Sequence, residues 1–201
     1  MRREFHVRFC EGGGVRFPSA TRLVIGFECQ DDARRVMDVL GKRLGRCGLT
    51  LHPDKTRLLP FRRPPASQQA GKGPATFDFL GFTLYMGRTQ AGRWMMWCKT
   101  RSARLRRSLQ AIAAWCRRYR HLSVQAQHAA LARRVRGHFN YFGVSGNFRS
   151  LLLFVEEVRQ IWPKWLRRRS NRTRLYGERV KHLFVRYPLP RPRIAIQIWG
   201  S

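Results

Sequence analysis

The chain has 201 residues and a formal net charge of +30, because 41 lysine and arginine residues outnumber 11 aspartate and glutamate residues. This length holds one ordinary domain or two small ones and excludes a large multidomain enzyme. Hydrophobic residues make up 43% of the chain and aromatic residues 12%, which excludes a wholly disordered basic tail. So high a charge on so small a protein predicts a polyanionic partner, and nucleic acid is the partner we expect.

The N-terminal residues predict a poorly ordered segment followed by a strand and a helix. Residues 1–22 hold three consecutive glycines and match no periodic pattern. The apolar run Leu23–Glu28 predicts a strand. Apolar residues at helical spacing then predict a helix over 31–47, which ends where Gly48 can adopt the conformation of a C-terminal cap.

Two further short strands are expected after this helix, at Leu49–Leu51 and Thr56–Phe61, and they complete a β-α-β-β unit. Residues 62–76 are rich in proline, glycine, alanine and glutamine, so we expect a linker there. A β-hairpin follows, with Phe77–Tyr85 as one arm and Trp94–Cys98 as the other.

Everything after residue 100 has the periodicity of helices, except an extended, proline-rich tail over 188–201. Pro163 is expected to kink or restart the third of these helices. The four helices are predicted at Ser102–Arg120, Val124–His138, Phe148–Ser170 and Thr173–Tyr187.

From the sequence we expect neither an export segment nor a cysteine framework. No run approaches the roughly 20 apolar residues of a membrane span, and the basic N-terminus lacks the apolar core of a secretory signal. The cysteines lie at least 18 residues apart without a Cys-x-x-Cys pair, so we expect buried, reduced thiols in a cytoplasmic protein that contacts no membrane. They are Cys10, Cys29, Cys47, Cys98 and Cys116.

Positive charge is concentrated in the C-terminal half. Residues 1–98 hold 17 basic and 8 acidic side chains, whereas residues 99–201 hold 24 basic and 3 acidic ones. Arginine interleaved with aromatic residues suits RNA, because phosphates bind guanidinium groups and splayed bases stack on rings. Aromatic residues at helical spacing are more often core residues than base platforms, and we expect that of most of them here. The residues concerned are Phe139, Tyr141, Phe142, Trp162 and Trp165.

Four blocks of sequence carry a resemblance to a known family. They are GLTLHPDKTRLLPF (Gly48–Phe61), FDFLGFTLY (Phe77–Tyr85), RGHFNYFGVSGN (Arg136–Asn147) and WLRRRSNR (Trp165–Arg172). In this order and spacing they resemble the later part of bacterial group II intron reverse transcriptase/maturase proteins, over about residues 23–195.

The resemblance implies an α+β fold. A small β-α-β-β remnant of the polymerase palm and a β-hairpin precede a mainly α-helical thumb and maturase-specific domain X. The implied segments are an unmatched N-terminus over 1–22, the palm remnant over 23–61, the linker over 62–76, the hairpin over 77–99, the helical domain over 100–187 and the tail over 188–201.

The family's polymerase activity requires aspartates that this chain lacks. In the family, palm carboxylates hold two Mg²⁺ ions, and a pair of them comes from a YADD motif. The resemblance places that motif directly before Leu23, where Thr21 and Arg22 stand in the positions of the two aspartates. Because an arginine repels a divalent ion, we expect no polymerase activity, no catalytic residue and no metal or cofactor; Mg²⁺ is expected for the full-length family only.

Other candidate polar residues in this region have simpler explanations. The adjacent Asp31 and Asp32 could suggest a metal site, but they open a predicted helix, so we expect them to cap it. We expect the same of Asp54. His52 and Lys55 match the family's LHPDKT motif near the primer side of the palm, and we expect them in a surface turn.

The resemblance implies an RNA-binding module of a bacterial cytoplasm, which binds group II intron RNA and helps it to fold for splicing. Helical arginines would bind phosphates, while the block 136–147 could be either a packed corner between helices or a direct RNA contact. The candidate RNA-binding residues are Arg104, Arg107, Arg118, Arg134, Arg136, Asn140, Arg149, Arg167, Arg168, Arg169 and Arg172.

Two alternative functions stay open. The chain could be one half of a split RNA-directed DNA polymerase, in which the strand edge at Leu23–Glu28 pairs with a separately encoded fingers and palm chain. It could also be a truncated reading frame with a residual basic surface and no selected function.

Overall fold

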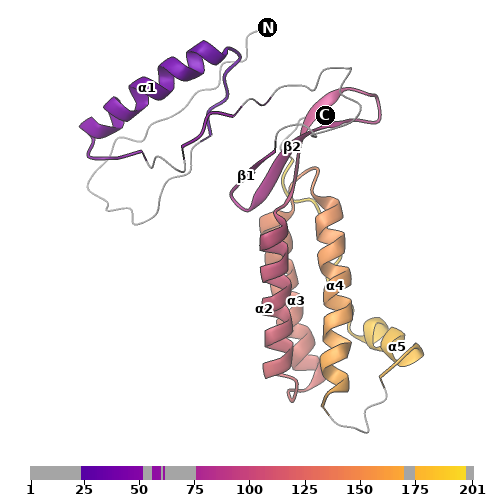
Figure 1. Cartoon of the computed structure of the whole chain (residues 1–201). Helices are drawn as coiled ribbons and strands as arrows, with labels where there is room; N and C mark the ends of the chain where they lie inside the picture. Colours follow the sequence, from indigo (N-terminus) through magenta and orange to yellow (C-terminus); the bar gives the residue numbers. More distant parts are fainter. Residues whose placement is uncertain (1–23, 52–55, 60, 62–75, 170–174, 198–201) are drawn as a thin grey trace. The chain divides into compact units, whose positions relative to one another are not determined.

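The protein has an α+β fold that divides into two compact units, residues 1–56 and residues 57–201 (Figure 1). The computed structural model describes residues 24–51, 56–59, 61, 76–169 and 175–197. Within these ranges no helix is both long enough and apolar enough to cross a membrane.

The first unit contains one helix, α1 (Gln30–Arg46), close to the predicted bounds. Apolar residues at helical spacing give it one apolar side and one charged side. Gly48 follows with a φ of 70°, and the N–H of Leu49 donates to the Leu44 carbonyl at 3.0 Å. This is the C-terminal cap that the sequence predicted, because glycine adopts a left-handed conformation without a steric penalty.

The strands predicted around α1 are wrong over the described residues. Residues 24–28, 49–51 and 56–59 form no strand, and Val24 and Leu49 are 51% and 58% exposed. A strand needs a neighbouring strand to satisfy its backbone hydrogen bonds, and an apolar β-type composition does not supply one. The predicted β-α-β-β unit is therefore not formed there. The predictions for residues 1–22, for His52, Asp54 and Lys55, and for residues 62–75 lie outside the described residues.

The second unit begins with a three-stranded antiparallel sheet in the order β1-β2-β3. Its strands are β1 (Phe77–Phe79), β2 (Phe82–Arg88) and β3 (Trp94–Thr100). The predicted hairpin is confirmed as β2 and β3. Its first arm is split, because Leu80 and Gly81 have φ values of 46° and 86° and form a two-residue turn.

One face of this sheet packs on the helices. Phe82 pairs with Thr100 and Leu84 with Cys98, so these four residues share a face by the two-residue period of strands. Thr100 and Cys98 are buried. Phe82 packs against Phe142, which lies at the end of the third helix of the protein. The opposite face, which carries Tyr85, stays partly open to solvent.

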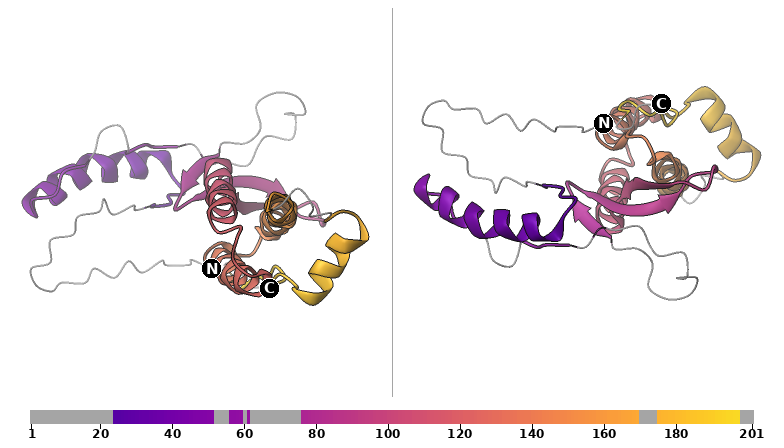
Figure 2. Two further views of the ribbon diagram at one scale, coloured as in Figure 1. Left: turned by 90° about the horizontal axis from the view of Figure 1, so that it is seen from below. Right: turned by 90° about the horizontal axis from the view of Figure 1, so that it is seen from above.

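Three long helices form a bundle, which lies below the sheet in the view of Figure 1. They are α2 (Ser102–Arg118), α3 (Val124–Phe142) and α4 (Phe148–Arg167). Viewed along their axes they surround a common centre (Figure 2). Their apolar stripes meet there, because residues three or four positions apart share a helix face. The buried core includes Ile112, Cys116, Leu131, Val135, Phe139, Phe142, Leu151, Phe154, Val155, Val158, Trp162 and Leu166.

The predicted helices are confirmed, with different ends. α3 runs four residues beyond the predicted His138, because Phe139 and Phe142 continue its apolar stripe. α4 continues through Pro163 without a restart. The last helix, α5 (Glu178–Arg186), begins later than predicted, after Gly177 with a φ of 48° and ψ of −120°, which a helix cannot accommodate.

The tail after α5 is irregular and returns to the junction between α3 and α4. Leu189 is buried in the core. The N–H of Ala195 donates to the Gly143 carbonyl at 2.6 Å, and Ser145 donates its N–H to the Ile196 carbonyl at 2.9 Å. These backbone hydrogen bonds attach the tail to the loop between α3 and α4.

Candidate nucleic-acid interface

Three predicted RNA-binding arginines share one exposed stripe of α2. Arg104, Arg107 and Arg118 are separated by 3 and 11 positions, spacings that return to the same side of an α-helix. All three side chains are exposed. α2 contains no acidic residue that could neutralise them.

An arginine–aromatic ladder lies at the C-terminal part of this stripe. The Arg134 guanidinium carbon lies 4.4 Å from the centre of the Trp115 ring. Trp115 and Tyr119 have ring centres 5.4 Å apart, and the Arg118 guanidinium carbon lies 5.5 Å from the Tyr119 ring. The order Arg134–Trp115–Tyr119–Arg118 joins α3 to α2. Guanidinium groups that stack on rings keep their N–H edges free for phosphate oxygens.

The end of α4 adds a second set of arginines. Arg168 stacks on Trp165 at 5.0 Å and Arg167 on Tyr176 at 4.7 Å. Arg169 behaves differently, because its Nη2 donates to the carbonyl of Leu122 at 2.5 Å and to that of His121 at 3.1 Å.

The Arg169 contacts bring two sequence-distant groups of arginines together. His121 and Leu122 belong to the loop that follows α2, so the C-terminal end of α4 lies beside the C-terminal end of α2. We call this region the basic end of the bundle. Its members are Arg117, Arg118, Arg120, Arg167, Arg168 and Arg169.

A buried network holds the loop of the basic end in place. Gln127 is 1% exposed, and its Nε2 donates to the carbonyls of Arg120 at 3.0 Å and Leu122 at 2.9 Å. Its Oε1 accepts from Nε1 of Trp162 at 3.0 Å. Ser123 caps α3 by accepting from the N–H of Ala126 at 3.2 Å. These hydrogen bonds attach the loop between α2 and α3 to α3 and, through Trp162, to α4.

The electrostatic environment of the basic end is strongly positive. Within α2, α3 and α4 the acidic residues are Glu156 and Glu157, and Glu156 pairs with Arg159 at 3.3 Å. Glu157 lies ten residues before Arg167, about 15 Å along the helix. The C-terminal ends of two helices meet here, and their dipoles partly offset the charge of clustered cations.

The other predicted RNA-binding residues lie elsewhere. Arg136 and Asn140 share the exposed side of α3, where Oδ1 of Asn140 accepts from Nη2 of Arg193 at 3.3 Å. Arg149 lies in the first turn of α4, 18 residues or about 27 Å from Arg167. Arg172 lies outside the described residues. The candidates therefore do not form a single site.

The block 136–147 is a packed corner over most of its length. Asn147 is 1% exposed and makes three hydrogen bonds inside the protein. His138 is buried, with its ring stacked on Phe154 at 3.7 Å, and burial lowers its pKa to about 4. Neither side chain is available to RNA. Tyr141, by contrast, is 56% exposed and donates its hydroxyl to the Leu80 carbonyl at 3.0 Å.

The expectation that most of the aromatic residues belong to the core is confirmed. Phe139 and Trp162 are buried within the bundle, and Phe142 is 8% exposed. Trp165 is half-buried and carries Arg168 on its ring, so it serves both the core and the surface.

The cysteine prediction is only partly correct. Cys98 and Cys116 are buried; burial raises the pKa of Cys98, and it raises that of Cys116 to about 12 although the Arg134 guanidinium acts in the opposite direction. Cys29 and Cys47 are exposed at the two ends of α1.

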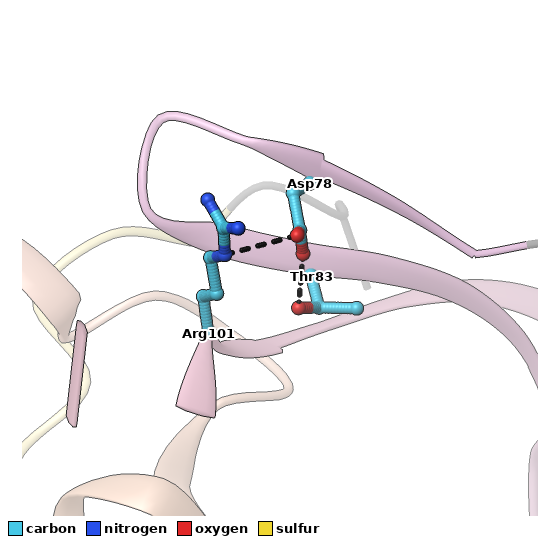
Figure 3. Close-up of polar contacts among 3 residues, drawn as sticks. All are labelled: Asp78, Thr83 and Arg101. Carbon is cyan, nitrogen blue, oxygen red and sulfur yellow. Dashed lines mark hydrogen bonds and ion pairs between the residues drawn. The ribbon is translucent and has the colours of Figure 1, made fainter. Parts of the chain in front are cut away.

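Several acidic residues of the described ranges make local contacts. Asp78 accepts from Nε of Arg101 at 3.0 Å and from the Thr83 hydroxyl at 2.6 Å, which joins β1 to β2 and to the start of α2 (Figure 3). Asp31 and Asp32 lie in the first turn of α1, at the predicted helix start, where their charges favour the helix dipole; the N-cap position is Cys29, whose side chain makes no capping hydrogen bond. Among the described residues, no three His, Cys, Asp or Glu side chains gather as a metal site.

An open hollow lies between α2 and α4. Its walls are mostly apolar, with Ser102, Arg106 and Gln110 as polar groups on the α2 side. The hollow lacks the paired titratable groups that acid–base or nucleophilic chemistry requires. Its lining residues are Ser102, Leu105, Arg106, Leu109, Gln110, Ala113, Leu153 and Ile161.

Trp115 and Tyr119 were not among the sequence-predicted site residues. Their spacing of four positions on a helix, next to Arg118, is the signal that could have indicated a stacked pair. Thr21 and Arg22, which stand where the resembled family has its aspartates, lie outside the described residues.

The chain matches no protein family, no curated protein and no solved structure.

Proposed function

We propose that the second unit binds structured RNA through the basic end of the bundle and the adjoining arginine–aromatic ladder. The observation that supports this most strongly is that Arg118 and Arg168, each stacked on an aromatic ring, lie in the last turns of two helices that end side by side, and that neither of these turns holds an acidic residue. Stacking reduces the conformational freedom of each guanidinium before a ligand arrives. Binding phosphate therefore costs less ordering entropy than it would on an unrestrained side chain.

RNA is a better fit than a smaller anion or an anionic membrane. Exposed rings beside guanidinium groups, such as Tyr119 beside Arg118, offer bases a stacking surface as well as charge for the phosphates. A lipid surface would instead be matched by a helix with a wide exposed apolar face. The stripe of α2 that carries Arg118 is polar or small over its exposed length.

The resemblance of the four sequence blocks directs the proposal to group II intron RNA and to a maturase role. In this proposal the protein neutralises phosphates and positions RNA segments, while the intron RNA itself carries out splicing. The chain has no polymerase activity of its own, because Thr21 and Arg22 stand in the positions of the family's catalytic aspartates.

Equilibrium binding of the full chain to a transcribed group II intron RNA tests the proposal, with bulk tRNA as competitor. We expect log K to fall linearly with log salt, with a slope of about −0.7 to −0.9 for each phosphate contacted. We also expect intron RNA to be preferred over tRNA. Equal affinity for both RNAs would show that the protein binds RNA without specificity, and would contradict a maturase role. An affinity that does not change with salt would contradict phosphate binding.

A further inference from the structure

The hollow between α2 and α4 leaves apolar side chains of both helices partly uncovered. α2 contributes Leu105, Leu109 and Ala113, which are half-buried. α4 contributes Ile161, which is half-buried, and Leu153, which is 50% exposed. The hollow has a volume of about 540 Å³ and opens to solvent. Because removal of apolar surface from water is favourable, a ligand that fills the hollow gains binding free energy.

The length and direction of the hollow match a third helix. α2 and α4 lie side by side and run in the same direction (Figure 1). The lining residues of α2 extend from Ser102 to Ala113, which is 11 positions or about 17 Å. A helix of three turns has this length, and its side chains at steps of three and four positions enter the groove between two helices. A helix also satisfies its own backbone hydrogen bonds, which apolar walls cannot supply.

The two walls of the hollow carry opposite charges. Arg106 lines the α2 wall, and Arg117, 11 positions later, returns to the same side of this helix, which contains no acidic residue. On α4, Glu157 lies four positions from both Leu153 and Ile161, so these three residues share one side of the helix. Among the described residues Glu157 has no ion-pair partner. A ligand helix is therefore matched by acidic residues on its edge toward α2 and by a basic residue on its edge toward Glu157.

We propose that this hollow is the docking site for an amphipathic helix of a partner protein, with apolar residues in the hollow, acidic residues along the edge that faces α2 and a basic residue opposite Glu157. RNA does not match mostly apolar walls, which offer phosphates few donors. A second copy of this chain does not match them through the same face, because two identical hollows placed face to face would enclose a void.

The docking site is separate from the stripe of α2 that carries the candidate RNA-binding arginines. Arg106 follows Arg104 by two positions and precedes Arg107 by one, so it lies on a different side of the helix from both. The partner helix and RNA can therefore bind at the same time, and the proposal does not depend on RNA binding.

The probe for this site is a labelled synthetic helix of about 18 residues, with leucines at helical spacing, glutamates on one edge and lysines on the other. Fluorescence anisotropy measures its binding to the nuclease-treated full chain, in about 0.3 M salt to screen the net charge. One helix buries less than a standard interface of about 1,200 Å², so we expect a dissociation constant on the order of 10 µM. A scrambled peptide of the same composition should bind about 10-fold more weakly or worse, because it lacks the apolar stripe. Equal binding of the two peptides overturns the proposal.

Two neighbouring leucines locate the apolar wall. Leu153→Glu places a charge in the hollow, whereas Leu152→Glu makes the same change at a position that is 44% exposed and does not line it. We expect Leu153→Glu to raise the dissociation constant of the probe about 10-fold or more and Leu152→Glu to change it less than about 2-fold. Equal effects, or none from Leu153→Glu, would overturn the assignment of binding to the hollow. Circular dichroism checks that both variants keep their helix content.

Two arginines separate local charge from net charge. Arg106→Glu and Arg133→Glu alter the net charge of the chain equally, but Arg106 lines the hollow and Arg133 is an exposed residue of α3 that does not. We expect Arg106→Glu to weaken probe binding about 5-fold and Arg133→Glu less than about 2-fold. If both variants weaken it equally, the net charge of the chain attracts the probe, and the proposed acidic edge is wrong.

Sedimentation equilibrium of the wild type and of Leu153→Glu tests the remaining occupant, a second copy of the chain. We expect both proteins to have the same apparent mass between about 5 and about 200 µM. Self-association of the wild type that Leu153→Glu abolishes would assign the hollow to a second copy and overturn the partner helix.

Discussion

The side chain of Asn147 holds both the backbone and the side chain of Thr100. Its Oδ1 accepts from the N–H of Thr100 at 2.7 Å, and its Nδ2 donates to the Thr100 hydroxyl at 2.8 Å and to the Phe142 carbonyl at 2.8 Å. Because Thr100 ends β3 and Asn147 precedes α4, this one amide fixes the sheet to the helical bundle. Both residues are buried, so no water can take over these hydrogen bonds.

Replacing this amide should lower stability strongly. Asn147→Ala leaves the buried N–H and hydroxyl of Thr100 without their partner, so we expect a loss of about 2 to 4 kcal/mol in the free energy of unfolding. Urea unfolding followed by circular dichroism measures this. Asn140→Ala, an exposed site of the same residue type, should change stability by less than about 0.5 kcal/mol. Similar losses for both variants would contradict the role of Asn147.

Stability should depend on pH through His138. Burial lowers its pKa to about 4, from 6.5 in the unfolded chain, and Nε2 has no hydrogen-bond partner. Between pH 4 and pH 6.5 the unfolded chain binds a proton at this site that the folded chain does not. The free energy of unfolding therefore keeps its full value above pH 6.5. It falls as the pH drops toward 4, by up to about 3 kcal/mol.

Thermal unfolding across this pH range checks the His138 prediction. His138→Phe keeps a ring between the neighbouring aromatic side chains and removes the titrating group, so the difference in melting temperature between wild type and variant should grow as the pH falls. A constant difference from pH 7 to pH 4 would show that His138 does not cause the dependence.

Arg169 and its neighbour Arg168 should separate stability from RNA affinity. Arg169→Gln removes two hydrogen bonds to backbone carbonyls and should cost about 1 kcal/mol of stability. Arg168→Gln removes only a surface stack and should leave stability within about 0.5 kcal/mol while it weakens RNA binding. Unfolding and RNA titration of both variants provide the comparison; a stability loss from Arg168→Gln as large as that from Arg169→Gln would contradict this division of roles.

Gly143 should tolerate no side chain. A Cβ there would contact the Phe139 carbonyl and lie 2.8 Å from that of Arg193, and both are backbone atoms. Gly143→Ala should therefore displace the tail and cost about 1 to 3 kcal/mol. Gly137→Ala is the matched control, because nothing lies within 4 Å and alanine favours the helix by up to about 1 kcal/mol. Hydrogen exchange of the Ala195 amide, which donates to Gly143, should accelerate only in Gly143→Ala.

The helices and the hairpin could be predicted because each has a periodic pattern that one element can satisfy by itself. The stripe through Leu131, Val135 and Phe139 requires a helix, whatever covers it. Strands at 24–28 and 49–51 could not be predicted in the same way, because a strand depends on a neighbouring strand, and none forms among the described residues of this unit.

The candidate site could be predicted only as a list of arginines. Sequence spacing places Arg107 and Arg118 on one stripe of α2, but it cannot show that the end of α4 lies next to this stripe. That relation depends on Arg169 and on the tertiary contact with the loop after α2. For the same reason the sequence could not distinguish the buried Asn147 from the exposed Asn140.

The most direct test of the central claim compares two double variants that remove the same charge. Arg118→Gln with Arg168→Gln alters the basic end, whereas Arg88→Gln with Arg93→Gln removes two exposed arginines from the hairpin, where Arg88 also stacks on a tryptophan. Both are titrated with intron RNA over a salt series. We predict that the first pair makes the slope of log K against log salt less steep, by about 1.5 in magnitude. The second pair should change the slope little. Equal slopes for the two variants would contradict the assignment of RNA binding to the basic end.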